Sequence, residues 1–444
     1  MGNHFSKIIF ELKTKILSPK LNNLHRKSEA SLGVKSLSTL NFVKRQAIIQ
    51  HAVKHSTFYR EKYAGLPLVE DGMQTHEDFL ALPPLTRDEL RSNFRSIKAD
   101  NVAFSNYRKA RTSGTTSAPV FLLHDKRHPE TPIRWRILNW WGIEPCENQA
   151  FIYRYKKPFI NSLKNKALWW PTKRVFLAMA NPSAKQLNKF VHDFNHIKPA
   201  LVQGYVDVVF EFAMYLLDND IKIHPPKMVW VTSAPLFEEQ REIMKKAFGA
   251  PVCDQYGNTE ILLIAAECPV QNGLHMMQDT VHIEFVDDNN QPVQPNTTGK
   301  ILLTDLTNYA FPLIRYEIGD EGKYKDHMCS CGSSLPLMDN VRGRQSMNIR
   351  TPSGLRIRGE HIMAMFEGYM KAFKEIQLRQ EANFSVCIEY VPRKLNQGSK
   401  EADEMTKLLM LRARCEIAVD CREIQKIQQV GLKSPLIISN LELP

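Results

Sequence analysis

Between residues 175 and 248, three short apolar runs alternate with three segments of helical hydrophobic spacing. The apolar runs are residues 175–180, 200–203 and 228–232, and the helical segments are 184–196, 206–217 and 237–248. A buried strand followed by a helix and a second buried strand forms a βαβ unit, whose two strands are parallel. The alternation therefore predicts an α/β fold built on a largely parallel sheet.

The regions on either side of this alternation have other patterns. Residues 1–100 read as mostly helical, and strands at 281–286 and 300–305, separated by a polar and proline-rich turn, predict a β subdomain. After Gly343-Arg344 a compact α+β unit is expected, with helices at 360–372 and 400–414, strands at 375–380 and 384–391, and a final segment at 417–430. We therefore expect an N-terminal domain over 1–343 and a mobile C-terminal domain over 344–444.

The formal net charge of the chain is +12, from 59 basic and 47 acidic residues. The basic residues are dispersed, and no basic stripe is interleaved with aromatic residues, so no nucleic-acid partner is expected. A solvated basic surface is the favoured interpretation of the charge. Attraction to nucleotide, anionic lipid or a polyanionic substrate is the alternative.

The first residues allow two interpretations. Apolar side chains at positions 5, 8, 9, 12, 16 and 17 have helical spacing, with Lys7, Lys13 and Lys15 between them, and Met1-Gly2 opens a loose myristoylation pattern. A helix docked on its own domain is favoured, and an interfacial helix in peripheral contact with a membrane is the alternative. No run of 18 apolar residues and no signal-peptide core is present, so a cytoplasmic location is expected. The eight cysteines are then not expected to form disulfides.

Three short motifs carry candidate chemistry. Residues 112–119 form a hydroxyl-rich loop with one glycine, which can wrap phosphate oxygens, although such a loop is more often a plain surface turn. Residues 255–260 place Glu260 after a strand, where a carboxylate could bind Mg²⁺ or simply begin a helix. Residues 312–320 end in Gly319-Asp320, and this carboxylate could accept both hydroxyls of a ribose or be an ordinary turn residue.

The order and spacing of these motifs, together with Gly343-Arg344, resemble the adenylate-forming superfamily. The resemblance is closer to its phenylacetate–CoA ligase branch, and within it to the CapK-like proteins of capsular polysaccharide biosynthesis. Residues 46–60 and 82–87 and the pair Gly204-Tyr205 also match that branch. The resemblance covers nearly the whole chain and implies a large N-terminal adenylate-forming domain, with parallel sheets and a β subdomain, followed by a small α+β domain.

The resemblance also implies a role for each motif residue. Thr112, Ser113, Gly114, Thr115 and Thr116 would hold the ATP phosphates, and Ser233, Ala234, Pro235, Gln255, Tyr256 and Gly257 would line the adenine and acyl pocket. Glu260 would bind magnesium, Thr259 would contact phosphate, and Asp320 would hold the ribose. Arg344 would lie at the hinge to the C-terminal domain. Lys433 corresponds to the late lysine that bridges acyl and phosphate oxygens in the family.

Two positions depart from the family pattern. The phosphate loop has Ser117-Ala118 where Gly-Lys is common, and Met347 stands three residues after Arg344, where an aspartate is frequent. The implied activity is ATP-dependent formation of an acyl-AMP, followed by transfer of the acyl group to CoA or to an amine. An amide-forming ligase acting on an amino sugar or amino acid is one alternative. A catalytically weak nucleotide-binding scaffold is an alternative from another class.

Four residues outside these motifs predict a structural zinc site. Cys268 and His275 form a Cys-x₆-His pair, Cys329 and Cys331 form a Cys-x-Cys pair, and Gly273 and Gly332 allow the tight turns beside them. Three thiolates and one imidazole make a closed tetrahedral donor set that suits zinc. The alternative is four unrelated residues in loops.

Overall fold

The computed structural model describes residues 2–32, 37–67, 72–111, 120–154, 169–179, 182–341, 348–358, 362, 365–366, 369, 372–393, 398–428 and 436–441. The chain divides into two compact units. Unit 1 comprises Met1–Ala110, Leu122–Glu317 and Gly322–Asn340, and unit 2 comprises Arg111–Phe121, Ile318–Glu321 and Val341–Pro444. The predicted boundary near residue 343 and the hinge residue Arg344 lie outside the described residues.

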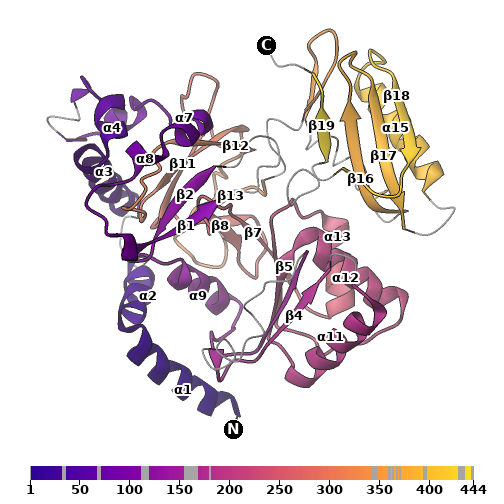
Figure 1. Cartoon of the computed structure of the whole chain (residues 1–444), viewed down its shortest axis with the longest axis horizontal. Coiled ribbons are helices and arrows are strands. Elements are labelled where there is room, and N and C mark those ends of the chain that lie inside the picture. The colour runs from indigo at the N-terminus through magenta and orange to yellow at the C-terminus, as the bar shows by residue number, and fades with distance from the viewer. Residues whose placement is uncertain are drawn as a thin grey trace. The chain divides into compact units, whose positions relative to one another are not determined.

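The N-terminal part of unit 1 is helical (Figure 1). Its helices are α1 (Gly2–Leu17), α2 (Pro19–Leu32), α3 (Leu37–His55), α4 (Thr57–Lys62), α6 (His76–Leu80), α7 (Arg87–Ser92) and α8 (Phe94–Ile97), and the 3₁₀ turn η1 (Phe104–Asn106) follows. A capping box begins α7, because the Thr86 hydroxyl accepts the Glu89 N–H at 3.2 Å and the Glu89 carboxylate accepts the Thr86 N–H at 2.9 Å. This cap fixes the first turn of α7, which carries Arg87.

Helix α1 has two apolar faces. On one face, the Phe10 ring meets the Trp135 ring edge-on at 5.9 Å, and Lys7 forms an ion pair with Glu144 at 2.8 Å. On the other face, Phe5, Ile8, Leu12 and Ile16 are exposed. The favoured docked interpretation therefore describes only one side of this helix. Among the described residues, no helix combines the length and hydropathy needed to cross a bilayer.

The main sheet of unit 1 has eight strands in the order β13-β9-β8-β7-β6-β5-β3-β4. Its strands are β3 (Gln149–Tyr153), β4 (Arg174–Ala178), β5 (Leu201–Tyr205), β6 (Met228–Thr232), β7 (Val252–Tyr256), β8 (Ala265–Glu267), β9 (Leu274–Met276) and β13 (Leu337–Met338). Strands β4, β3, β5, β6 and β7 are parallel, whereas β8, β9 and β13 continue the sheet antiparallel. The predicted α/β fold with a largely parallel sheet is confirmed, and the antiparallel extension was not predicted.

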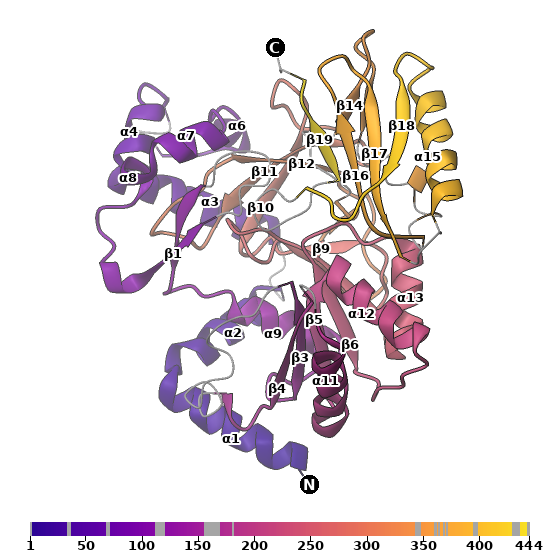
Figure 2. The same cartoon turned by 45° about the vertical axis from the view of Figure 1, so that its right-hand side comes forward.

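The two faces of the parallel strands differ because side chains alternate along a strand. One face packs on α11 (Ala184–Ile197), α12 (Val206–Asp218) and α13 (Glu238–Phe248), through Ile152, Val202, Val229 and Val231 among others (Figure 2). Gly204 is on this face, where an added Cβ would lie 2.2 Å from the Ile152 carbonyl oxygen. The other face carries larger and more polar residues, and Arg134 of α9 (Thr131–Trp140) reaches Gln203 there.

Two smaller sheets complete this part of the chain. Strands β10 (Val281–Val286), β11 (Gly299–Asp305) and β12 (Tyr316–Gly322) form a three-stranded sheet, in which β10 and β11 pair antiparallel from Val281 opposite Asp305. Strands β1 (Tyr107–Arg111) and β2 (Phe121–Asp125) form a two-stranded sheet on either side of residues 112–119. The expected strands at 281–286 and 300–305 are therefore present as an antiparallel pair.

Unit 2 is an α+β unit with its own apolar core. Its strands β16 (Phe373–Gln380), β17 (Val386–Pro392), β18 (Val419–Glu423) and β19 (Ile437–Ser439) form a sheet in the order β18-β17-β16-β19. Helix α15 (Ser399–Arg412) buries Ala402, Met405 and Leu409 in this core, and β14 (Asn348–Arg350) pairs with β15 (Arg356–Arg358). Most of the helix expected at 360–372 lies outside the described residues.

Candidate functional site

The site residues expected from sequence fall into two groups. Ser233, Ala234, Pro235, Gln255, Tyr256, Gly257, Thr259, Glu260 and Asp320 lie within the described residues. Thr112, Ser113, Gly114, Thr115, Thr116, Arg344, Met347 and Lys433 lie outside them, so the structure leaves their expected roles as predictions.

The carboxyl ends of β6 and β7 bring two of the expected segments together. The Thr232 hydroxyl donates to the Gln255 carbonyl at 3.0 Å, and the Gln255 side-chain amide donates to the Leu262 carbonyl at 3.1 Å. Ser233 directly after β6 has φ = 77°, a left-handed conformation that costs energy for a residue with a side chain and that concentrates at functional sites. Gly257 after β7 leaves no room for a side chain, since an added Cβ would lie 2.0 Å from the Leu262 carbonyl oxygen.

Glu260 is buried in the bend that follows β7. The Tyr316 hydroxyl donates to Glu260 Oε1 at 3.2 Å, and Arg87 Nη1 lies 3.8 Å from the same oxygen. The partly buried guanidinium of Arg87 compensates the carboxylate charge. Both partners engage Oε1, so these two contacts leave Oε2 for a further ligand.

The contacts of Glu260 with Tyr316 and Arg87 were not predicted. Both residues belong to segments that the sequence singled out, at 312–320 and 82–87, but neither had been assigned a contact with the carboxylate. The sequence signal that could have drawn attention to them is their position, since Arg87 ends one motif and Tyr316 lies inside another. Sequence spacing does not say which side chains meet across turns.

His124 and Asp320 each have a defined setting in the structure. His124 of β2 forms a hydrogen bond with the backbone of Thr259, and burial together with the charge of Arg108 lowers the pKa of His124, so its imidazole is neutral near pH 7. Asp320 lies buried in β12, directly after Gly319, which has φ = 83°. Asp320 belongs to unit 2 and Glu260 to unit 1.

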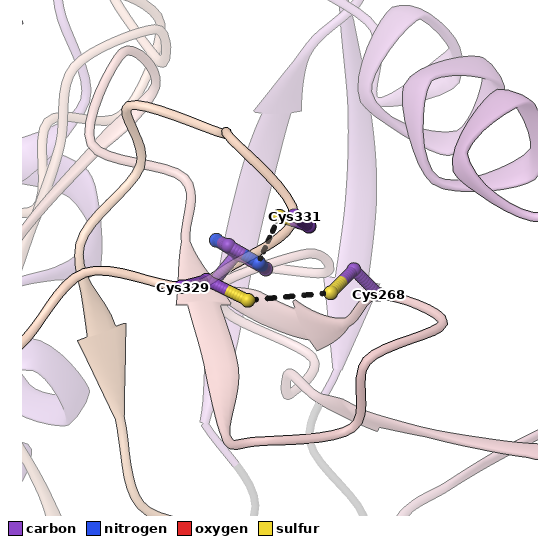
Figure 3. A group of neighbouring side chains, drawn as sticks. Cys268, Cys329 and Cys331 are labelled. Atoms are coloured by element: carbon purple, nitrogen blue, oxygen red, sulfur yellow. Dashed lines mark hydrogen bonds between the residues drawn. The ribbon is translucent and has the colours of Figure 1, made fainter.

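The four expected metal ligands lie together in unit 1 (Figure 3). Cys268 follows β8, His275 is in β9, and Cys329 and Cys331 lie in the turn before β13. Their ligand atoms are all within 4.8 Å of one another. At Gly273 an added Cβ would lie 2.8 Å from the Met338 carbonyl oxygen, and its φ is 111°, so the turn that presents His275 requires glycine.

The spacing of these atoms matches a tetrahedral zinc site. Cys268 Sγ lies 3.7 Å from Cys329 Sγ, and Cys331 Sγ lies 3.4 Å from His275 Nε2. Zinc–sulfur and zinc–nitrogen bonds of about 2.3 and 2.05 Å at tetrahedral angles give edges of roughly 3.8 and 3.5 Å. The S–S separation is far too long for a disulfide, and Figure 3 shows the Cys268 and Cys329 side chains pointing toward each other.

The protonation of these ligands also suits a metal. His275 Nδ1 is 3.1 Å from the Leu335 carbonyl oxygen, which fixes the proton on Nδ1 and leaves Nε2 as a donor of electrons. Burial lowers the pKa of His275, so the ring is neutral. Burial and the neighbouring thiols raise the pKa of Cys268 to about 12, so in the absence of a cation this thiol stays protonated.

No protein-family profile matches the chain. In sequence it is 21% identical over 261 residues to protein CapK of Staphylococcus aureus. That alignment covers 56% of this chain and 54% of CapK, so the chain matches about half of that protein. It is also 21% identical over 419 residues to the phenylacetate-coenzyme A ligase of Escherichia coli (strain K12), covering 92% of each.

Solved structures with the same fold include enzymes of two kinds. A 2-hydroxyisobutyryl-CoA ligase in the postadenylation state aligns with a TM-score of 0.69 and 18% identity, covering 90% of this chain and 89% of that one. The amide bond synthetase McbA from Marinactinospora thermotolerans aligns with a TM-score of 0.53 and 12% identity, covering 75% and 69%. These likenesses agree with the fold and the resemblance expected from the sequence motifs.

Proposed function

We propose that this chain is an ATP-dependent carboxylate ligase of the adenylate-forming superfamily, which its fold and its similarity to phenylacetate-coenzyme A ligases support. It activates a carboxylic acid as an acyl-AMP, with release of pyrophosphate, and then transfers the acyl group to an acceptor. The carboxylate attacks the α-phosphate of ATP in line with the departing pyrophosphate, and a thiol or amine later displaces AMP.

The observation that carries this proposal is the setting of Glu260. Its carboxylate lies in the bend after a parallel strand, where open α/β sheets bind ligands, and its Oε1 is held by Tyr316 and Arg87. Oε2 is then the oxygen that would bind Mg²⁺, which when present neutralises charge on the phosphates. In this proposal Thr259, next to Glu260 in the chain, contacts phosphate, and Ser233, Ala234 and Pro235 line the nucleotide pocket; the φ of 77° at Ser233 supports a functional role there.

The other roles in this proposal come from the sequence motifs. Thr112, Ser113, Gly114, Thr115 and Thr116 hold the ATP phosphates, and Gln255, Tyr256 and Gly257 line the pocket. Asp320 holds the ribose, and Arg344 is the hinge of the domain that carries Lys433. Lys433 neutralises charge in the first half-reaction only. Lys433→Ala should therefore impair acyl-AMP formation and spare the use of preformed acyl-AMP, and equal loss in both assays would refute this division.

The acceptor is proposed to be CoA, because the relatives that span most of the chain are CoA ligases. An amine acceptor is the second candidate, which the fold shared with an amide bond synthetase favours. The similarity to CapK supports a role in surface or capsular polysaccharide synthesis. A panel of carboxylic acids, assayed for pyrophosphate release with and without CoA and candidate amines, tests the activity and the acceptor together. No pyrophosphate with any acid would count against the ligase.

Zinc is the metal proposed for Cys268, His275, Cys329 and Cys331. Three sulfurs and one imidazole nitrogen at tetrahedral separations favour a closed structural site over a catalytic one, which would keep an open position. The ion would supply no chemistry to the reaction. It would join the chain just after β8 to the turn before β13.

Peripheral membrane contact is proposed for the exposed face of α1. Residues 2–27 contain six basic residues and one acidic residue, Glu11, and the exposed apolar side chains of α1 lie among these charges. An amphipathic helix with this combination binds anionic bilayers through both apolar burial and electrostatic attraction.

A further inference from the structure

On the α9-facing side of the parallel sheet, two arginines have no carboxylate partner among the residues that the structure describes. Arg134 projects from α9, and Arg174 begins β4; within the described part of the chain neither lies within ion-pair distance of a carboxylate. Both side chains are half-buried, whereas three fully buried arginines of unit 1 are each paired at 2.8–2.9 Å: Arg136 with Asp279, Arg241 with Glu267, and Arg315 with Glu284. Arg45 is buried as well and has no carboxylate within ion-pair distance among the described residues, but it bonds to Asn41 and His76. Arg134 and Arg174 differ from it because each lies near enough for its charge to act on the other.

The partners that the two guanidiniums do have are neutral. Arg134 Nη1 donates to Gln203 Oε1 at 2.7 Å, and its Cζ lies 4.9 Å from the Trp230 ring centroid. Arg174 Cζ lies 3.4 Å from the ring centroid of Trp169, and its buried Nε donates to no acceptor among the described residues. The aromatic rings hold the guanidiniums in place but do not neutralise them.

The two positive charges also act on each other. Burial and the charge of Arg134 lower the pKa of Arg174 to about 9, and burial lowers the pKa of Arg134 as well. The exposed Glu130 attracts Arg134 but is not within ion-pair distance of it. The connection between β3 and β4, residues 155–168, contains four lysines and no acidic residue, so its sequence offers no carboxylate either.

The pair adjoins the proposed adenylation site. Gln203 and Trp230 contact Arg134. Each lies two residues before the carboxyl end of its strand, which is Tyr205 in β5 and Thr232 in β6. Thr232 bonds to Gln255, as described above. Glu130 also acts on both Arg134 and His124, and His124 bonds to the backbone of Thr259. A ligand bound at the ends of these strands could therefore reach the guanidiniums.

We propose that Arg134 and Arg174 bind a second anionic group of the carboxylic acid substrate, remote from the carboxylate that is adenylated. The inference rests on the proposed ligase activity and names the class of its substrate. Guanidiniums bind carboxylate or phosphate through two parallel hydrogen bonds, and a bound anion relieves the repulsion between two desolvated positive charges. The substrate class is therefore a dicarboxylic acid or a carboxylic acid that carries a phosphate or phosphonate.

Matched acids test this specificity through pyrophosphate release. Butanoate is compared with butanedioate, benzoate with benzene-1,4-dicarboxylate, and each diacid with a phosphono acid of equal length. In the wild type, kcat/KM should be about 30-fold or more higher for the anionic member of each pair. Arg134→Met and, separately, Arg174→Met should remove most of this preference by raising KM for the anionic acids far more than for the neutral acids.

The matched control is Arg154→Met. Arg154 directly follows β3, the neighbour of β4 in the sheet, and it forms an ion pair with Asp207. Its removal should therefore leave the preference intact. Arg134→Lys keeps one charge without the planar fork and should restore part of the preference. Melting temperatures identify any variant that fails to fold, and in that event the other arginine carries the test.

Calorimetric binding of butanedioate without ATP separates this inference from the proposed activity. If no acid releases pyrophosphate but butanedioate binds, and either methionine variant abolishes that binding, the proposed ligase activity is refuted and the anion site is supported. Pyrophosphate release with equal kcat/KM for neutral and anionic acids would overturn the inference and keep the activity. Absence of both pyrophosphate and binding would overturn both.

Discussion

Tyr316 donates a hydrogen bond to Glu260 across 3.2 Å and so connects two motifs that are 56 residues apart in the sequence. The bond, with Arg87 at 3.8 Å, holds one carboxylate oxygen and orients the other. A buried carboxylate would be costly without such partners, and their removal leaves the charge uncompensated. The pair is therefore a sensitive point for both stability and activity.

Glu260→Gln should lower pyrophosphate release by about 100-fold or more, because the neutral amide no longer offers an anionic oxygen to Mg²⁺. The shape of the side chain is kept, so the melting temperature should change by only a few degrees. Glu242→Gln, at an exposed position on α13, is the matched control and should retain full activity. Full activity of Glu260→Gln would exclude this carboxylate from the mechanism.

Tyr316→Phe removes the hydroxyl and keeps the ring. It should lower the free energy of unfolding by about 2 kcal/mol, since a hydrogen bond to a charged group is lost inside the protein. Activity should fall less than in Glu260→Gln, because Arg87 still compensates the charge. Urea unfolding with paired activity assays measures both effects, and an unchanged midpoint would show that the bond adds no stability.

Cys329→Ser should lower both the zinc content and the melting temperature. The purified protein should contain about one zinc per chain by elemental analysis, and a strong chelator should lower its melting temperature by several degrees. Cys415→Ser, at an exposed cysteine of unit 2 outside the cluster, should change neither quantity. Wild-type protein without zinc and without a response to chelator would contradict the site.

Asp254 should make the stability of unit 1 fall between about pH 4 and pH 7. Burial and the charge of Glu267 raise the pKa of this carboxyl from 3.8 to about 7, although Arg241 and the amide of Asn340 at 2.9 Å act in the opposite direction. The folded state therefore holds a proton that the unfolded state has lost, and unfolding becomes easier as pH rises through this window.

Asp254→Asn supplies the measurement for this effect. The substitution keeps an oxygen that accepts from Asn340 and removes the titration. The difference in melting temperature, wild type minus variant, should decrease from pH 4 to pH 7 and level off above it. A difference that stays constant over this range would show that Asp254 has the same protonation in both states.

Ile8→Glu and Leu12→Glu should reduce the fraction of protein that sediments with vesicles containing anionic lipid. Both side chains lie on the exposed apolar face of α1, which we propose enters the bilayer surface. Leu411→Glu on α15 is the control, because that leucine is equally apolar and 72% exposed but lies in unit 2. Equal sedimentation of all three variants and the wild type would argue against contact through α1.

The sequence predicted those elements whose side-chain pattern is local. The runs at 228–232 and 237–248 correspond to β6 and α13 almost residue for residue, because burial on a parallel sheet and on one helix face both leave a regular apolar period. The short strands β8, β9 and β13 were not predicted, since their length of two or three residues carries no period. Their pairing depends on the turns around them.

Contacts between distant segments could be predicted only where the chemistry of the side chains restricts their partners. Cysteines and a histidine could be grouped from sequence because their chemistry limits what they pair with, and the structure brings Cys268, His275, Cys329 and Cys331 together. The partners of Glu260 could not be named, since any nearby hydroxyl or cation would serve. Among the described residues no carboxylate lies within ion-pair distance of Arg134 or Arg174, and sequence could not show this, because it depends on how far distant acidic side chains lie in the fold.

The Cys268–Cys329 contact joins positions 61 residues apart, and the chain between them contains β9, β10, β11 and β12. A metal held there would turn this stretch into a closed ring, which costs the unfolded chain several kcal/mol of freedom and so favours the native topology. A protease cut at the exposed turn of Asp288 and Asn289 would then open the ring without separating the two fragments. The ion would then join the two fragments in addition to the β10–β11 and β9–β13 pairings, so a chelator should make the nicked protein dissociate at a lower temperature.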